Sequence, residues 1–134
     1  MAAGNTRCVV RTPDVQILIA EDDKDSRFLM RRVIQKSFPQ AIITEMSDGE
    51  SVLKRFMDTG ADLLIVDHKI PVMSGLDLIS GVRFINTTVP IILVSNSPNV
   101  EQEAAGSGIN YFLDKANLLR DLPVFLAEAL GKEV

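Results

Sequence analysis

The chain has 134 residues, of which 46% are hydrophobic and 24% are charged, and this composition fits one globular domain and excludes a disordered or fibrous chain. The formal net charge is -4 and the basic residues are scattered, which argues against direct binding to nucleic acid. With one cysteine and no long apolar stretch, the sequence predicts neither an intrachain disulfide nor a signal peptide or membrane-spanning helix. We therefore expect a cytoplasmic protein that does not insert into membranes.

The first part of the chain is polar and differs from the rest. Residues 1–13 are predicted to be a flexible N-terminal extension, and residues 14–134 are predicted to form one folded domain. In that domain, short apolar runs alternate with stretches of helical periodicity. Such alternation is typical of repeated β-α units around a parallel sheet that is covered on both faces. The predicted fold class is therefore α/β.

The apolar runs predict five short strands. They cover Val15–Ala20, Ala41–Met46, Leu63–Val66, Ile91–Val94 and Tyr111–Leu113. Helical periodicity predicts three helices between the first four strands, at about Ser26–Lys36, Gly49–Asp58 and Leu76–Phe84. Asp25 is expected to cap the first helix, and either Ser47 or Asp48 is expected to cap the second.

The last two helical segments contain residues that disfavour helices. The segment Ser97–Gly108 holds a proline, an asparagine and two glycines, so any helix there is expected to be short. The segment Val124–Leu130 has helical periodicity, but Pro123 disfavours helical geometry at Leu122. We expect the last helix either to start with Asp121 as its cap or to be kinked.

Polar side chains stand at the carboxyl ends of four predicted strands. They are Glu21 and Asp22 after the first strand, Asp67 after the third, Ser95 after the fourth and Lys115 after the fifth. Ligands of an open doubly wound sheet bind beyond these strand ends, so one crevice can hold all five residues. Carboxylates a few ångströms apart repel by roughly 1 to 4 kcal/mol, and Mg2+ relieves this repulsion because it prefers oxygen ligands and bridges carboxylates to phosphate. The pattern predicts phosphoryl chemistry with magnesium.

Together with Pro71 and Gly75 in the loop after Asp67, these residues carry a resemblance to a known family. From about Val15 to Leu130, the chain resembles the response regulator receiver domain of two-component signal transduction, of the single-domain chemotaxis type. The resemblance implies a flavodoxin-like, doubly wound sheet of five parallel strands, (βα)5, with strand order 2-1-3-4-5. The alternation of elements alone leaves the strand order open.

The resemblance also implies a role for each residue. Asp67 would accept a phosphoryl group from a histidine kinase or a histidine phosphotransfer protein. Mg2+ would be held by Glu21, Asp22, Asp67 and the backbone carbonyl of Lys69. Ser95 would hydrogen-bond a phosphoryl oxygen after transfer, and Lys115 would pair first with Asp67 and then with the phosphoryl group. Such a domain is not a conventional enzyme, although it catalyses its own phosphorylation and dephosphorylation.

A conformational switch is a further implication of the resemblance. Ser95 and Phe112 are the expected switch residues, because Phe112 stands where family members often have an aromatic side chain that turns inward after phosphorylation. Ordinary core packing of Phe112 is the equal alternative.

The family commonly uses the face of the fourth helix, fifth strand and fifth helix for docking, so a homodimer and an unidentified downstream protein are candidate partners. His68, the only histidine, is expected to be a bystander at the surface.

Two residues depart from the family pattern. Ala116 stands where the family usually has a proline, and the peptide bond before it is expected to be trans, since a cis bond there would cost about 2.5 to 4 kcal/mol. Asn96 stands where a small residue is usual, and its amide is expected to narrow access to Asp67. A further hypothesis is that Lys69 and Ser97 flank the attached phosphoryl group and set how readily water reaches it.

Two other functions remain open at this stage. A degenerate receiver that acts as a phosphorylation-independent interaction module is favoured by Ala116 and Asn96, but it is opposed by the complete set of acids, serine and lysine. A Mg2+-dependent phosphohydrolase with an aspartyl nucleophile is less well supported. In such enzymes a second acid commonly follows two residues after the nucleophile, and Lys69 stands there instead.

Overall fold

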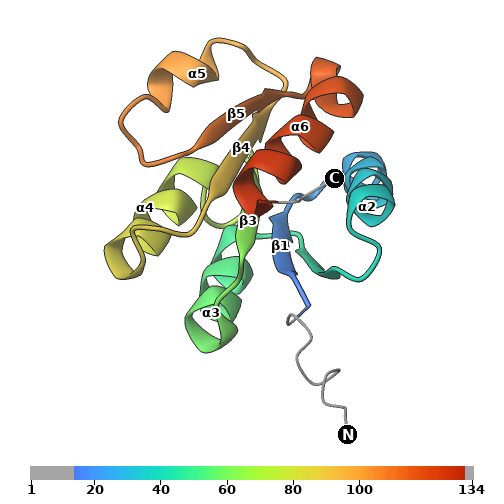
Figure 1. The fold of residues 1–134 in the computed structure, drawn as a ribbon. Helices are drawn as coiled ribbons and strands as arrows, with labels where there is room; N and C mark the ends of the chain where they lie inside the picture. Colours follow the sequence, from blue (N-terminus) through green and yellow to red (C-terminus); the bar gives the residue numbers. More distant parts are fainter. Residues whose placement is uncertain (1–13, 132–134) are drawn as a thin grey trace, which may run out of the picture.

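The fold is built around one sheet of five parallel strands, and a computed structural model describes it over residues 14–131. The strands are β1 (Gln16–Ala20), β2 (Ile42–Met46), β3 (Leu63–Asp67), β4 (Ile91–Ser95) and β5 (Tyr111–Asp114). They lie in the order β2-β1-β3-β4-β5, and every neighbouring pair is parallel (Figure 1). The predicted α/β class, the flavodoxin-like topology and the strand order are therefore confirmed. The predicted extension, residues 1–13, lies outside the described residues.

Helices cover both faces of this sheet (Figure 1). They are α2 (Lys24–Ser37), α3 (Gly49–Thr59), α4 (Gly75–Ile85), α5 (Val100–Glu103) and α6 (Leu118–Leu130), with a 3-10 helix, η1 (Lys115–Asn117), before α6. α2 and α6 pack on one face around a core that includes Met30 and Leu122. α3, α4 and α5 pack on the other face around a core that includes Phe56 and Ile79. Because both faces are covered, β3 and β4 are buried along their whole length, which explains their unbroken apolar runs.

Aspartate caps set the first residues of α2 and α3. Asp48 accepts a hydrogen bond from the backbone N–H of Ser51 at 2.8 Å, which confirms one of the two caps predicted for this helix. The cap predicted for α2, Asp25, is wrong, because Asp23 accepts from the backbone N–H of Ser26 at 2.9 Å. Both caps bond the residue three positions later, which is the usual geometry of an N-cap. Asp25 lies in the first turn of α2, where its negative charge interacts favourably with the positive end of the helix dipole.

The last helix begins earlier than the sequence indicates. α6 begins at Leu118 and contains Pro123, so the predicted start with Asp121 as cap is wrong. Leu118, Leu122 and Leu126 are buried in the core, and this packing outweighs the loss of one backbone donor at the proline. α5 has four residues, which confirms the short helix expected in that segment. None of the helices in the described part of the chain has the length and apolar character needed to cross a bilayer.

One arginine ties α4 to the edge of the sheet. Arg83 donates from Nε to the carbonyl of Gly108 at 2.9 Å and from Nη2 to Asn110 Oδ1 at 3.0 Å. Its Nη1 donates to the carbonyl of Asn86 at 3.1 Å. The same Asn110 oxygen accepts the backbone N–H of Ile91 at 2.8 Å. The guanidinium therefore holds the loop that leads into β5 against the start of β4.

Changing Arg83→Met is expected to lower the free energy of unfolding by about 2 kcal/mol, because hydrogen bonds of a charged group contribute about 1.5 to 3 kcal/mol. Denaturation with urea measures this change. Arg120→Met is the matched control, since the Arg120 side chain is 72% exposed and pairs with its neighbour Asp121. The control is expected to lose less than about 0.5 kcal/mol. Similar losses in the two variants would show that Arg83 does not act as a clamp.

Candidate functional site

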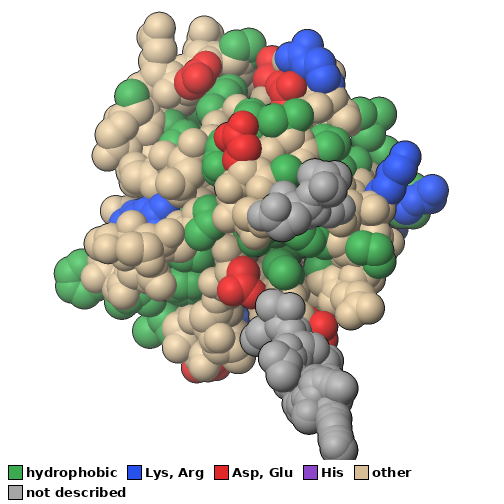
Figure 2. Space-filling model, viewed as in Figure 1, with side chains coloured by type: hydrophobic (Ala, Val, Ile, Leu, Met, Phe, Trp, Pro, Cys, Tyr) green, Lys and Arg blue, Asp and Glu red, His purple; other side chains and the backbone are tan. Residues whose placement is uncertain are grey.

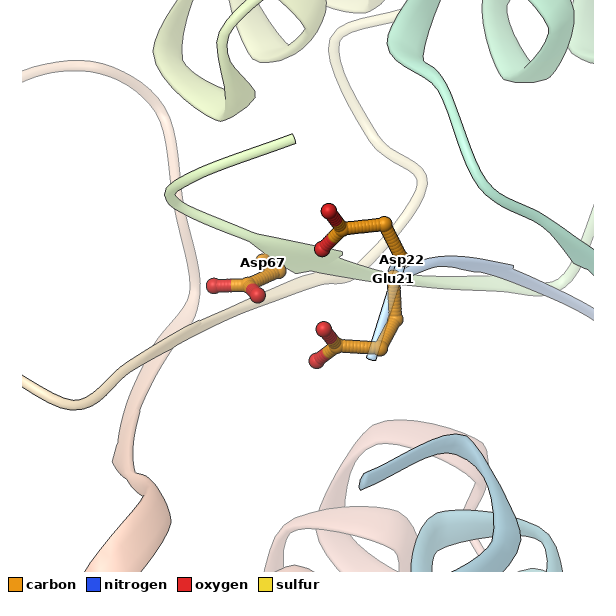
Figure 3. A group of neighbouring side chains, drawn as sticks. All are labelled: Glu21, Asp22 and Asp67. Carbon is orange, nitrogen blue, oxygen red and sulfur yellow. The ribbon is translucent and has the colours of Figure 1, made fainter. Parts of the chain in front are cut away.

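Three carboxylates meet at the carboxyl ends of β1 and β3. Glu21 and Asp22 follow directly on β1, and Asp67 is the last residue of β3. Because β1 and β3 are parallel neighbours with Ala20 opposite Val66, both strands end at the same edge of the sheet. One oxygen from each carboxylate lies within 4.8 Å of the other two, and the three side chains converge on a common space (Figure 3). The structure thus brings together the acids that the sequence predicted to share a crevice.

The three acids differ in their exposure to water. Glu21 is fully buried and Asp67 is 6% exposed, whereas Asp22 is exposed. Burial, together with hydrogen bonding and repulsion from Asp67, raises the pKa of Glu21 to about 7. Glu21 Oε2 accepts the backbone N–H of Asp23 at 3.1 Å, but its buried Oε1 has no hydrogen-bond donor among the described residues. Keeping the buried Glu21 carboxylate ionised beside Asp67 costs free energy, and a cation in the crevice would lower that cost.

Lys115 supplies positive charge beside the two buried acids. Its Nζ donates to Asp67 Oδ2 at 3.1 Å and lies 3.0 Å from Glu21 Oε1. The second contact has the distance of an ion pair but not the direction of a hydrogen bond. Burial by itself lowers the pKa of Lys115, but the close contacts and negative charges of Glu21 and Asp67 outweigh burial and raise this pKa. Lys115 is therefore a charged counterion that Glu21 and Asp67 share.

The loop after β3 is held closely against the sheet. The backbone N–H of His68 donates to the carbonyl of Val94 at 2.9 Å, and that of Gly75 donates to the carbonyl of His68 at 3.0 Å. The backbone N–H of Lys69 donates to Asp67 Oδ1 at 3.3 Å. A Cβ atom on Gly75 would lie 2.4 Å from the backbone oxygen of Asp67. Only glycine permits this approach, which fixes the backbone of Asp67.

Changing Gly75→Ala is expected to destabilise the protein by about 2 kcal/mol, because the new methyl group must push the backbone at Asp67 aside. The displaced carboxylate should also lose metal affinity, and both effects can be followed by thermal unfolding with and without Mg2+. Gly81→Ala in the same helix is the matched control. Its new Cβ meets only the flexible end of Leu53 at 3.0 Å, and alanine favours the helix. Equal effects of the two changes would refute the fit argued for Gly75.

Asp67 borders two separate hollows. The first, of about 520 Å3, is lined by residues that include the three acids, Lys69, Asn96 and Lys115. The second, of about 210 Å3, is lined by residues that include Asp67, Lys69, Ser95, Asn96 and Ser97. Lys69 and Asn96, like Asp67, belong to both linings. The expectation that Asn96 narrows the access to Asp67 stays a prediction.

The two expected switch residues lie on strands beyond Asp67. Ser95 is 3% exposed at the end of β4, and its Oγ donates to the carbonyl of Ser97 at 3.2 Å and accepts the N–H of Ser97 at 2.9 Å. Phe112 is half-buried and packs against the core beneath α4 and α5. Tyr111 packs on the opposite face, where it stacks on Phe125 with ring centroids 4.9 Å apart. Of the two aromatic residues of β5, Phe112 is thus the one on the face that α3, α4 and α5 cover.

Two contacts near the crevice were missed by the sequence reasoning. His68 Nε2 lies 3.6 Å from Glu103 Oε1, so the side chain of His68 reaches α5; its expected role as a bystander stays a prediction. No pattern in the sequence links these two residues. Asp114 Oδ1 accepts the N–H of Ala116 at 3.0 Å, a bond that a proline at this position could not form. An aspartate two residues before its donor is the signal of such a turn, and the peptide bond before Ala116 is trans, as expected.

Comparison with known proteins identifies one family. The model of the response regulator receiver domain matches residues 17–126. The two-component response regulator ORR41 of Oryza sativa subsp. japonica is 27% identical over 118 residues, which cover 85% of this chain and 93% of that protein. The transcriptional regulatory protein PrrA of Mycobacterium leprae is 25% identical over 109 residues, which cover 80% of this chain but only 46% of PrrA. This chain therefore spans about half the length of PrrA.

Solved structures show the same fold. The receiver domain of NtrX from Brucella abortus superposes with a TM-score of 0.77 at 21% sequence identity. The match covers 87% of this chain and 99% of that domain. At this level of identity the likeness concerns the arrangement of strands and helices, and it agrees with the strand order described above.

Proposed function

The chain belongs to the response regulator receiver domain family, and on that basis we propose that it is a phosphoacceptor of a two-component system. Asp67 receives the phosphoryl group from a histidine kinase or a histidine phosphotransfer protein, and residues 14–134 form the receiver domain. The observation that carries this proposal is the crevice in which Asp67 lies beside two further carboxylates and the ammonium group of Lys115. The proposed location is the cytoplasm.

The acidic triad is typical of the metal site of a receiver domain, and we propose Mg2+ as the metal. The proposed ligands are Glu21, Asp22, Asp67 and the backbone carbonyl of Lys69. The metal-binding atoms are all oxygens, which a hard divalent cation prefers. The buried Glu21 Oε1 accepts no hydrogen bond among the described residues, and its charged neighbour is Lys115 Nζ at 3.0 Å. When bound, magnesium supplies positive charge that offsets the carboxylates and the phosphoryl oxygens.

The chain's own residues carry the transfer. An oxygen of Asp67 attacks phosphorus, the bond between phosphorus and the donor's histidine nitrogen breaks, and the electron pair of that bond stays on the nitrogen. Lys115 leaves its pair with Asp67 and binds a phosphoryl oxygen. The Ser95 hydroxyl, which donates to the carbonyl of Ser97 before transfer, turns to another phosphoryl oxygen. Attack of water on phosphorus later restores the Asp67 carboxylate and releases inorganic phosphate.

Phosphorylation is further proposed to change the face formed by α5, β5 and α6. The rotation of Ser95 alters the wall of the smaller hollow, and Phe112 can then move inward. α5 has only four residues, and its contact with His68 connects it to the loop after Asp67. A downstream protein, or a second copy of the chain in a homodimer, is the proposed partner of this face. The single-domain chemotaxis type stays a prediction.

Lys69 and Ser97 both line the smaller hollow beside Asp67. Removing their side chains, in Lys69→Ala and Ser97→Ala, is expected to open the hollow to water and to release phosphate several-fold faster. The decay of the phosphorylated protein in Mg2+ measures this rate. Lys54→Ala, at an exposed lysine of α3, is the control for loss of a positive charge. Lifetimes equal to that of the parent in both variants would retire this prediction.

The proposed function is tested by incubating the full chain with acetyl phosphate and Mg2+ and weighing the intact protein by mass spectrometry. We expect a gain of about 80 Da that disappears with time and does not form when EDTA removes the metal. Beryllofluoride with Mg2+ is expected to bind the unmodified crevice and to block the gain. The absence of any gain at saturating donor would contradict the proposal.

The same experiment separates the alternative functions. A Mg2+-dependent aspartyl phosphohydrolase would turn over added phosphate esters continuously. A phosphorylation-independent interaction module would neither gain mass nor bind beryllofluoride. A receiver forms one adduct of limited lifetime, and incubation with candidate kinases then identifies its donor.

A further inference from the structure

A group of exposed hydrophobic side chains lies at the C-terminal ends of α3 and α4, and we call it the helix-end patch. Met57, Phe84 and Ile85 are 62%, 91% and 49% exposed. A hollow of about 410 Å3 beside them is lined by Phe56, Met57, Gly60, Ile85 and Asn86. Figure 2 shows hydrophobic side chains at the surface over the lower ends of these helices. Apolar side chains that gather around a hollow are typical of a surface that binds another segment.

Two acidic residues lie close to the helix-end patch. Asp58 follows Met57 near the end of α3, and Asp62 lies in the loop before β3. The last turn of α3 holds no basic residue, so the negative end of the helix dipole adds to these charges. Neither aspartate forms an ion pair with another described residue, and Arg83 of α4 is engaged by oxygens of three other residues. A segment that suits this patch is apolar and carries positive charge at its ends.

The start of β1 lies beside the helix-end patch. The N–H of Gln16 donates to Asp62 Oδ2 at 2.8 Å, and the N–H of Asp62 donates to the carbonyl of Gln16 at 2.8 Å. Asp62 is two positions from Gly60, which lines the hollow. The described chain begins at Asp14, and four extended residues before it span about 14 Å. Residues 9–11 are therefore within reach of the hollow.

The residues at that distance have the chemistry that the patch requires. Residues 7–11 read Arg-Cys-Val-Val-Arg, an apolar trio between two positive charges. We propose that this segment binds the helix-end patch of its own chain, with the valines against the apolar surface and the arginines near Asp58 and Asp62. The proposal does not depend on the phosphoacceptor function, because the patch and the acidic crevice lie at opposite ends of the strands.

The only cysteine of the chain, Cys8, allows a direct test. A disulfide forms only when the two Cα atoms approach within about 7 Å. The full-length Ile85→Cys variant is equilibrated in a glutathione redox buffer, and the intramolecular disulfide is quantified by mass spectrometry. Val124→Cys on α6 is the matched control, since Val124 is 50% exposed and Ile85 is 49% exposed. We expect the disulfide to be favoured at least about tenfold at position 85 over position 124.

A second variant separates binding from the mere length of the tether. Val9→Asp with Val10→Asp, introduced into the Ile85→Cys protein, keeps the chain length and removes the apolar contact. Binding of the segment predicts a several-fold fall in the disulfide yield. An unchanged yield would overturn the proposal, because the tether alone would then explain the bond. Equal yields at positions 85 and 124 would also overturn it, and a disulfide between two chains would assign the patch to a second copy instead.

Discussion

Changing Asp67→Asn is expected to abolish phosphoryl uptake, with a loss of at least about a hundredfold in the rate. An amide at this position does not attack phosphorus at neutral pH. Glu21 cannot take its place, because it is fully buried and its Oε1 lies 3.0 Å from Lys115 Nζ. The measurement is the gain of about 80 Da in the presence of acetyl phosphate and Mg2+, located afterwards by peptide mapping.

The same substitution is not expected to unfold the protein. Asparagine has the shape of aspartate, and Lys115 keeps its ion pair with Glu21 at 3.0 Å. The lost pair between Lys115 and Asp67 is offset by weaker repulsion among the carboxylates of the metal-free crevice. We expect the free energy of unfolding to change by less than about 1 kcal/mol. Asp114→Asn is the matched control, because Asp114 ends β5 at the same edge of the sheet but lies outside the triad. Uptake that survives in Asp67→Asn and fails in Asp114→Asn would place the acceptor elsewhere.

Changing Lys115→Met is expected to lower the free energy of unfolding of the metal-free protein by about 3 kcal/mol. The Lys115 side chain is 12% exposed and is the counterion of Glu21 and Asp67, whose side chains are 0% and 8% exposed. Removing one partner of a buried ion pair typically costs about 3 to 5 kcal/mol. We expect the lower end of this range, because Glu21, whose pKa is already raised to about 7, can take up a proton and limit the cost.

Magnesium is expected to restore much of the stability lost in Lys115→Met, because a divalent cation can replace the missing ammonium group beside the acids. Urea denaturation with Mg2+ and with EDTA measures this recovery. Lys69→Met is the matched control, since Lys69 is an exposed lysine that lines the same hollow. That variant is expected to remain within about 0.5 kcal/mol of the parent. A Lys115→Met protein that is fully stable without metal would contradict the counterion role.

The strands were predictable because their environment is uniform. β3 and β4 are buried on both faces, so every position is apolar until the strand reaches the edge of the sheet. The first turn of a helix is less constrained. Asp23 and Asp25 are both plausible caps in the sequence, and only the hydrogen bond to Ser26 distinguishes them. Pro123 was misleading because three buried leucines of α6 contribute more than one lost backbone bond.

The candidate site was predictable in its members but not in its electrostatics. Parallel strands that end at one edge bring Glu21, Asp22 and Asp67 together. The sequence does not show that Glu21 is fully buried while its neighbour Asp22 is exposed, because that depends on the packing around β1. It also does not show that the Ser95 hydroxyl is engaged by Ser97.

By itself, the sequence determined the α/β class, the five strands and the residues that stand at their ends. Strands that are buried on both faces appear as short apolar runs, and the helices that cover them appear as stretches of helical periodicity. The contacts between segments far apart in the chain were decided only by the tertiary structure. One such contact is the pairing of Lys115 with both Glu21 and Asp67. Others are the hydrogen bonds from Arg83 to Gly108 and Asn110 and the approach of His68 to Glu103 of α5. Their energies depend on distance, direction and exclusion of water, and these quantities exist only once the strands and helices have packed.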